Sequence, residues 1–117
     1  MYHIKLLRLL SEIKHFEVEA QNEYDVMGMT GRPGLGIYFT FKAVIGQNEV
    51  KNIYFSTINC PIMLTIGEAI CRMAEGKTYQ EISCIKEQDV RDRLGDVPFG
   101  KERNIRQALE ALNQIIP

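Results

Sequence analysis

Apolar residues in the first part of the chain recur at three- and four-residue spacing. The series is Ile4, Leu6, Leu7, Leu9, Leu10, Ile13 and Phe16. This spacing is typical of an amphipathic helix, which we expect to run from about Tyr2 to about Glu17. A polar stretch over 19–25 and a glycine-rich connection over 28–36 follow. Glycines this dense favour bends of the backbone over helix.

The period of the hydrophobic pattern changes to two at Ile37. The apolar positions are Ile37, Phe39, Phe41 and Ala43, and they alternate with Tyr38, Thr40 and Lys42. Such alternation places one face of a strand against a core and the other in water. A turn signal, Gly46-Gln47-Asn48, separates this run from a second one that ends at Thr57, so residues 37–57 predict a β-hairpin. We expect a third, earlier strand over 24–29.

Helix signals follow the hairpin. Asn59 is the expected N-cap of a helix that starts at Pro61, because proline already has the backbone angle of a first helical residue. Gly76 suits the position that ends this helix. Thr78 and Glu81 have the spacing of a capping box before a short helix.

Two further helices are expected, over Gln88–Leu94 and over Lys101–Ile116, where apolar residues again recur at helical spacing. The strands precede most of the helices. This segregation indicates an α+β fold, a small antiparallel three-stranded sheet with helices packed on one face. We expect one domain over residues 1–117.

Composition and charge say little about the fold, but they exclude several classes of partner and location. The 117 residues are 45% hydrophobic and 25% charged, which is typical of a soluble globular protein. The formal net charge is −1, so we expect no nucleic acid as a partner. The first ten residues have neither the pattern of a signal peptide nor that of a membrane span. We therefore expect a cytoplasmic protein that contacts no membrane.

Three cysteines without a C-x-x-C pair predict free thiols rather than disulfides or a zinc knuckle. Cys60 stands at the start of a helix, where free N–H groups favour a thiolate that could bind metal or take up sulfur. Cys71 and Cys84 are expected to be small core residues. His3 and His15 are twelve residues apart on the expected first helix, and we interpret both as surface or helix-flanking residues.

The order of the signals from Pro33 to Ile116 resembles the NifU/IscU family of iron–sulfur cluster scaffolds. In that family a Cys-Gly-Asp motif opens a hairpin, and a second cysteine begins the helix after it. A Gly-Lys-Thr/Ser turn ends that helix, and a third cysteine, often after histidine, begins the last helix. Here Cys60 stands at the strand-to-helix junction, Gly76-Lys77-Thr78 is the turn, and 108–112 has the family's Ala-x-Glu-Ala-Leu pattern. The resemblance implies the SufE/NifU fold.

Most of the implied ligand positions hold other residues. The resemblance places Pro33-Gly34-Leu35 where Cys-Gly-Asp stands, and Arg103-Asn104 where His-Cys stands. Proline and leucine offer no donor atom, arginine stays charged, and an amide is a poor ligand for iron in a sulfide cluster. The implied site is therefore Gly34, Cys60 and Asn104, with Cys60 as its metal ligand. One thiolate cannot hold an iron–sulfur cluster that needs four, although the resemblance implies such a cluster or iron.

Three functions are compatible with these residues, and none of them is enzymatic except a variant of the last. The first is a scaffold-like or accessory protein of iron–sulfur cluster assembly that works through Cys60. Its partners would be a cysteine desulfurase or another assembly protein, a second copy of the chain in a homodimer, or glutathione. The second is an interaction module that keeps the scaffold fold without a cluster. The third is a small-molecule binder or enzyme that reuses the vacated site at Gly34, Cys60 and Asn104.

Overall fold

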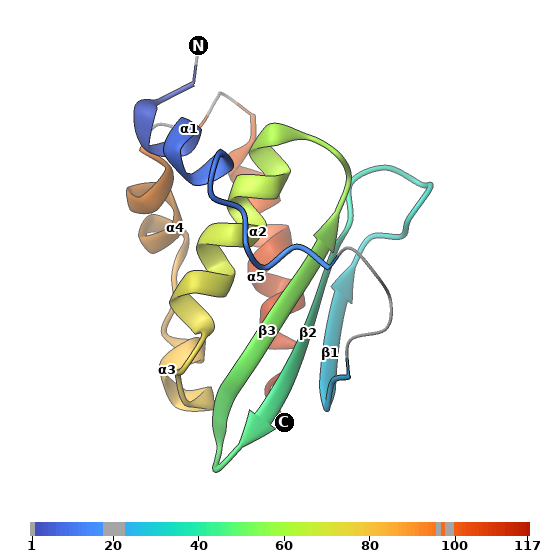
Figure 1. The fold of residues 1–117 in the computed structure, drawn as a ribbon. Helices are drawn as coiled ribbons and strands as arrows, with labels where there is room; N and C mark the ends of the chain where they lie inside the picture. The colour runs from blue at the N-terminus through green and yellow to red at the C-terminus, as the bar shows by residue number, and fades with distance from the viewer. Residues whose placement is uncertain (1, 18–22, 96, 98–99) are drawn as a thin grey trace.

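A three-stranded antiparallel sheet carries helices on one of its faces (Figure 1). The computed structural model describes residues 2–17, 23–95, 97 and 100–117. The strands are β1 (Val26–Thr30), β2 (Phe39–Gly46) and β3 (Glu49–Thr57), in the order β1-β2-β3. The helices α2 (Pro61–Ala74) and α5 (Glu102–Asn113) pack on the sheet. The α+β prediction is confirmed.

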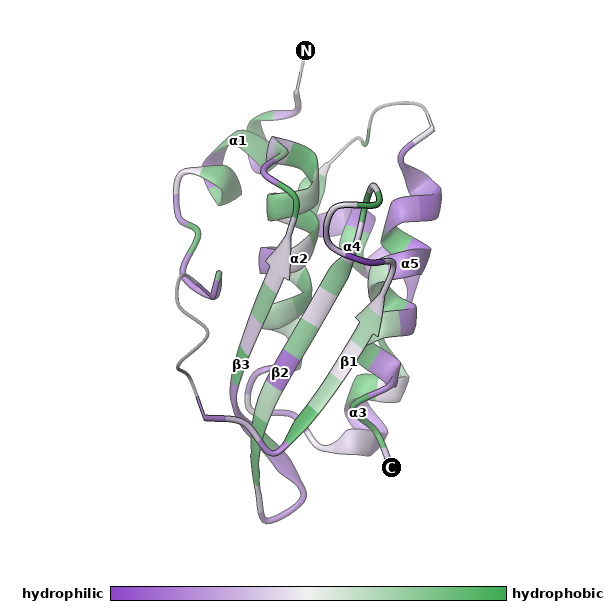
Figure 2. Ribbon diagram, turned by 90° about the vertical axis from the view of Figure 1, so that its right-hand side faces the viewer, coloured by the Kyte–Doolittle hydropathy of each residue, from purple (hydrophilic) through white to green (hydrophobic). Residues whose placement is uncertain are grey.

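Three shorter helices complete the helical layer. They are α1 (Ile4–Leu10), α3 (Tyr79–Ser83) and α4 (Glu87–Leu94), and each packs against α2. In the ribbon coloured by hydropathy, hydrophilic residues of α5 lie on its outward side and apolar residues face the sheet (Figure 2). In the part of the chain that the structure describes, no helix is both long enough and apolar enough to cross a membrane.

The β2–β3 hairpin is present and buries the predicted apolar face of β2, but Thr40, which was expected in water, is buried as well. Phe39, Phe41 and Ala43 are fully buried, and Phe41 pairs with Phe55 across the strands. Gln47 and Asn48 connect the strands with positive φ angles of 55° and 64°. Two such residues are the signature of a type I′ turn, whose twist matches that of paired strands. The predicted hairpin and the earlier strand, β1, are both confirmed.

The first helix is much shorter than predicted. It ends at Leu10, where the Ser11 hydroxyl donates a hydrogen bond of 2.7 Å to the carbonyl oxygen of Arg8. Residues 13–17, here called the edge segment, instead run extended beside β3. The N–H of Phe55 donates to the carbonyl of His15 at 2.9 Å, and the N–H of Glu17 donates to the carbonyl of Phe55 at 2.8 Å. Pairing with a distant strand therefore overrides the helical spacing of Ile13 and Phe16.

The boundaries of other helices also differ by a few residues from those predicted. The N-cap of α2 is Cys60 and not Asn59, which lies one residue too early to cap it. The last helix ends at Asn113, three residues before the predicted Ile116. Gly76 follows α2 with a φ of 81°, as expected of a residue that ends a helix. Of the predicted polar stretch, residues 19–22 lie outside the described part of the chain.

The capping box of α3 is present and gives a prediction for stability. The Thr78 hydroxyl accepts from the N–H of Glu81 at 3.2 Å, and the Glu81 carboxylate accepts from the N–H of Thr78 at 3.1 Å. Hydrogen bonds from the backbone and hydroxyl of Thr78 lower the pKa of Glu81. We expect Thr78→Ala to lower the free energy of unfolding by about 1 kcal/mol in urea denaturation. Ser83→Ala, at the other end of α3, is the control and should change it by less than about 0.5 kcal/mol.

Candidate functional site

Cys60 joins β3 to α2. Its φ and ψ of −136° and 127° are extended, and its carbonyl oxygen accepts the first hydrogen bond of the helix, from the N–H of Leu64 at 2.9 Å. The sulfur makes no capping hydrogen bond to the first turn of α2, and the residue is half-buried. The thiol is thus free for other chemistry and lies at the end of a helix that favours negative charge.

Gly34 lies in the loop between β1 and β2. The N–H of Leu35 donates to the carbonyl of Arg32 at 3.1 Å, and Gly34 has a φ of 85°. Proline before a glycine of positive φ is the pattern of a type II turn. A Cβ built on Gly34 would meet no atom within 4 Å, and Leu35 is 78% exposed. The turn therefore projects away from the body of the protein.

Asn104 lies in the first turn of α5 and is 4% exposed, whereas the neighbouring Arg103 is exposed. The first turns of α2 and α5 and the β1–β2 loop all lie at the same end of the molecule (Figures 1 and 2). The fold thus brings the three implied segments to one end. It does not pack Gly34 against another residue.

The described residues offer no ready-made metal centre. Across residues 2–17, 23–95, 97 and 100–117, no three His, Cys, Asp or Glu side chains gather closely enough to hold a metal ion. Four cysteine-type ligands are the usual requirement of an iron–sulfur cluster. A cluster bound at Cys60 would therefore need further ligands from outside the described residues of this chain.

The other two cysteines have different surroundings. Cys71 is fully buried in α2, as predicted, and burial together with the carboxylates of Glu68 and Glu75 raises the pKa of its thiol well above the ordinary value. The prediction that Cys84 is a core residue is wrong, because Cys84 is exposed. It ends α3, a helix that buries only Ile82.

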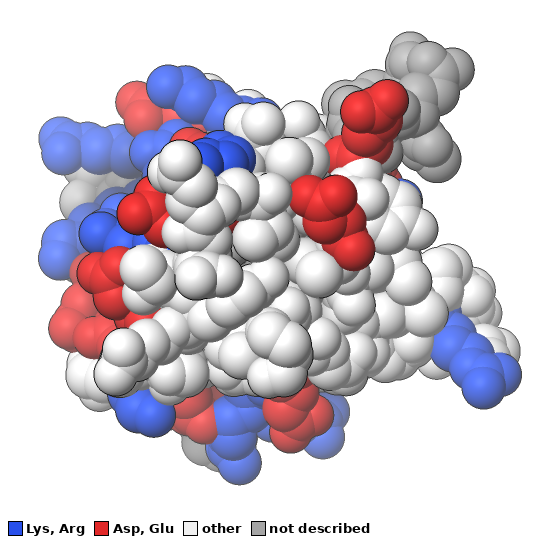
Figure 3. All heavy atoms as spheres, turned by 90° about the horizontal axis from the view of Figure 1, so that it is seen from below, with Lys and Arg blue, Asp and Glu red and all other residues white. Residues whose placement is uncertain are grey.

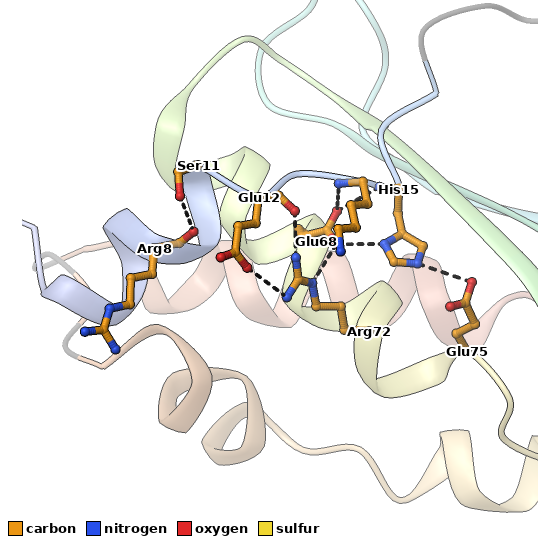
Figure 4. Close-up of polar contacts among 8 residues, drawn as sticks. Arg8, Ser11, Glu12, His15, Glu68, Arg72 and Glu75 are labelled. Atoms are coloured by element: carbon orange, nitrogen blue, oxygen red, sulfur yellow. Dashed lines mark hydrogen bonds and ion pairs between the residues drawn. The ribbon is translucent and has the colours of Figure 1, made fainter.

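Glu68 is the centre of a polar cluster that sequence reasoning missed (Figure 4). Its side chain is fully buried on α2. One carboxylate oxygen accepts from the backbone N–H groups of Lys14 and His15, both at 2.9 Å. The other accepts from Arg72 Nε at 2.8 Å and lies 2.7 Å from His15 Nδ1. The cluster therefore ties the edge segment to α2.

Hydrogen bonding outweighs burial at this carboxylate. Burial alone would raise the pKa of Glu68, but the hydrogen bonds from Arg72, His15 and Lys14 lower it below the ordinary value. A signal was present in the sequence, since Glu68 interrupts an apolar stripe and Arg72 stands four residues later. That spacing suits an ion pair on one helix face.

His15 is not the surface residue that we expected. Its ring is 14% exposed and contacts two carboxylates, Glu68 through Nδ1 and Glu75 through Nε2 at 3.2 Å. The reason is the short first helix, because the extended edge segment turns His15 toward α2. His3 does flank α1, as expected, and its Nδ1 accepts from the N–H of Lys5 at 3.0 Å.

An apolar pocket of about 600 Å³ lies beside Cys60. Its lining residues are Leu10, Ile13, Lys14, Phe16, Thr57, Asn59 and Leu64. They come from the end of α1, the edge segment, the end of β3, the junction between β3 and α2, and the first turn of α2. This pocket is not the small-molecule site that was predicted at Gly34, Cys60 and Asn104, because none of those three residues lines it.

Charged side chains gather on the side of the molecule that carries α3 and α4 (Figure 3, left). A second hollow, of about 470 Å³, lies on the helical layer and includes Cys84. Its charged lining residues are Arg72, Glu75, Lys77, Glu81, Asp89, Asp92 and Arg93. Because cations and carboxylates are mixed there, this hollow has the character of a solvated surface.

Comparison with known proteins places the fold in a known group. The family model of the NifU-like N terminal domain matches residues 1–117. Two relatives from Archaeoglobus fulgidus, the iron–sulfur cluster assembly scaffold proteins IscU 1 and IscU 2, are each 29% identical over 92 residues. The match covers 79% of this chain and 60% of each relative. The chain thus spans about 60% of the length of these curated relatives.

Solved structures agree with the fold. The N-terminal part of a NifU-like protein from Brucella abortus has a TM-score of 0.71 at 13% identity, over 97% of this chain and 90% of that one. A putative iron–sulfur cluster assembly scaffold protein for the SUF system, from Fervidobacterium islandicum AW-1, has a TM-score of 0.68 at 10% identity. That match covers 99% of this chain and 96% of the other. At these identities the likeness concerns the fold alone.

Proposed function

Because the chain belongs to the NifU-like N terminal domain family, we propose that it is a non-enzymatic accessory protein of iron–sulfur cluster assembly that contributes Cys60 as its single ligand. The curated relatives named above are scaffold proteins of this process. The observation that carries the proposal is the position of Cys60, half-buried before α2 with its sulfur unused by the helix.

The cluster or iron ion is the cargo of this function, and other molecules must complete its coordination. Pro33 and Leu35 lack donor atoms, and Arg103 remains a cation. Two copies of the chain supply two Cys60 thiolates, half of the four that a cluster needs. The remaining ligands would come from glutathione or from a partner protein such as a cysteine desulfurase. The cysteine desulfurase would also supply the sulfur.

Anaerobic reconstitution tests this role. The protein is incubated with ferrous iron, sulfide and glutathione, or with iron, cysteine and a cysteine desulfurase. We expect visible charge-transfer absorption and bound iron in the wild type, and at least a tenfold loss of both in Cys60→Ser. Cys84→Ser is the matched control, because it removes a second free thiol at the end of a helix, one that is more exposed than Cys60. Cys84→Ser should behave as the wild type.

Two results would reject the role of Cys60. One is a wild-type protein that binds no iron under any of these conditions, and the other is equal absorption in Cys60→Ser. Either result would favour the second candidate, an interaction module that keeps the fold without a cluster. The exposed Leu35 and Arg103, at positions where the family has ligands, favour that alternative. It predicts that Cys60→Ser binds a cysteine desulfurase with unchanged affinity.

A further inference from the structure

The apolar pocket beside Cys60 has the features of a ligand site that the proposed function does not use. Its volume of about 600 Å³ lies within the range of roughly 300–1,000 Å³ that is typical of small-molecule sites. Ligand sites are usually lined by apolar side chains with a few polar groups that fix orientation. This pocket has that composition.

Four apolar side chains form most of its wall. Leu10, Ile13, Phe16 and Leu64 are all only partly buried, although they come from three separate segments of the chain. Each would lose further contact with water if a hydrocarbon group filled the space between them. Burial of such surface is the main favourable term in binding an apolar group.

The pocket wall has few polar side chains, and its charge is positive. Among the lining residues that the structure describes, Lys14 is the only charged one, and Asn59 and Thr57 are the other polar ones. The Thr57 hydroxyl already donates to the carbonyl of Tyr38 at 2.7 Å. Among the residues that the structure describes, no carboxylate lies within 4.0 Å of the Lys14 ammonium. An anionic group at the rim would therefore find a cation that is not already paired there.

The wall that carries Lys14 is held firmly in place. The N–H groups of Lys14 and His15 both donate to the buried Glu68, and the edge segment pairs with Phe55 of β3. The backbone that carries the Lys14 side chain is therefore held in one position. A fixed wall lowers the ordering cost of binding.

We propose that this pocket binds an anionic amphiphile, a free monocarboxylate whose hydrocarbon chain lies against Leu10, Ile13, Phe16 and Leu64 while its carboxylate pairs with Lys14. The inference goes beyond the proposed function and does not depend on it, because no iron, sulfide or Cys60 chemistry is involved.

Decanoate is the probe, used at concentrations where it stays monomeric, with binding followed by the backbone amide resonances of isotope-labelled protein. We expect shifts at residues 10–16 and 57–64 and weaker binding of decyltrimethylammonium, which has the same chain and the opposite charge. Lys14→Gln should weaken decanoate binding about two- to fivefold, the scale of a partly exposed ion pair. The same variant should leave the binding of decan-1-ol unchanged.

Matched variants separate the pocket from general effects. Lys51→Gln changes the net charge equally but lies on the β2–β3 hairpin, and Leu7→Gln removes an exposed apolar side chain of α1 that does not line the pocket. Both should bind decanoate as the wild type does. Leu64→Gln should weaken binding about tenfold, since it removes apolar wall. Because Leu64 is partly buried, the surface variant Lys14→Glu provides a second test and should weaken binding further than Lys14→Gln.

Three results would overturn the inference. They are the absence of decanoate-induced shifts around the pocket, equal binding of the cationic amphiphile, and equal decanoate binding by Lys14→Gln. If vesicles of phosphatidylglycerol shift these resonances and decanoate does not, the pocket faces a membrane surface and the free monocarboxylate is rejected. A failure of iron reconstitution would leave all of these expectations unchanged.

Discussion

Replacement of Glu68 by alanine is expected to lower the free energy of unfolding by roughly 3–5 kcal/mol, the usual cost of removing one partner of a buried ionic cluster. The buried carboxylate accepts from two backbone N–H groups and from Arg72, and it also contacts the His15 ring. Alanine leaves these groups without their acceptor in a partly buried site. Urea denaturation followed by circular dichroism measures the loss.

Glu87→Ala is the control for this variant. Glu87 also pairs with arginine, at 2.9 Å from Arg106 Nε, but it lies at the surface. A surface pair contributes about 0–1 kcal/mol, so the control should remain close to the wild type. A loss below about 1 kcal/mol for Glu68→Ala would show that the cluster does not hold the edge segment.

The lowered pKa of Glu68 also predicts how stability depends on pH. In the unfolded chain a glutamate takes up its proton near pH 4.3, whereas the folded protein keeps Glu68 ionised to lower pH. As the pH falls below about 4.3, the unfolded state therefore binds more protons and stability decreases. The contribution is complete above this pH and is lost as the pH falls through the folded-state pKa. Glu68→Gln should show a smaller decrease over this range.

Substitution of Gly28 by alanine is the second change with a large expected effect. A Cβ at Gly28 would lie 1.9 Å from the carbonyl oxygen of Ala111, on the backbone of α5. An overpacked site typically costs about 1–3 kcal/mol. We expect the upper end of that range, because a main-chain atom of a helix cannot move aside alone. Denaturant unfolding gives the size of the effect, and faster amide exchange in β1 would locate it.

Gly46→Ala is the matched control on the neighbouring strand. A Cβ there would meet only the flexible side chain of Lys51, at 3.1 Å or more. We expect a change within about 0.5 kcal/mol. If Gly28→Ala and Gly46→Ala destabilised the protein equally, close packing of β1 under α5 would not be the cause.

Local patterns predicted the strands and the longer helices well. The alternation from Ile37 to Ala43 predicts a strand with one buried face, and β2 has that face, although it begins at Phe39 and also buries Thr40. The first helix was predicted too long. Ile13 and Phe16 continue the helical spacing, but their conformation is set by Glu68 and Phe55, which lie some forty to fifty-five positions away in the chain. Sequence spacing carries no information about such partners.

The candidate site was predicted in part. The sequence located Cys60 at a strand-to-helix junction, because proline and the end of the apolar alternation mark that point. It could not show that the turn at Gly34 projects into solvent, which depends on the path of the β1–β2 loop, or that Asn104 is buried, which depends on how α5 packs. The apolar pocket was missed because its walls come from segments that only the fold brings together. The roles of Gly34, Cys60 and Asn104 remain predictions.

The edge segment has one more consequence, for the behaviour of the protein at high concentration. A strand at the border of a sheet presents unpaired N–H and C=O groups, which can recruit a strand of another molecule and begin aggregation. Along the middle of β3 these groups are already occupied, because Phe55 exchanges both of its outward hydrogen bonds with His15 and Glu17. The chain thus covers the middle of its own border strand, and Glu68, which accepts hydrogen bonds from Lys14 and His15, holds the covering segment in place.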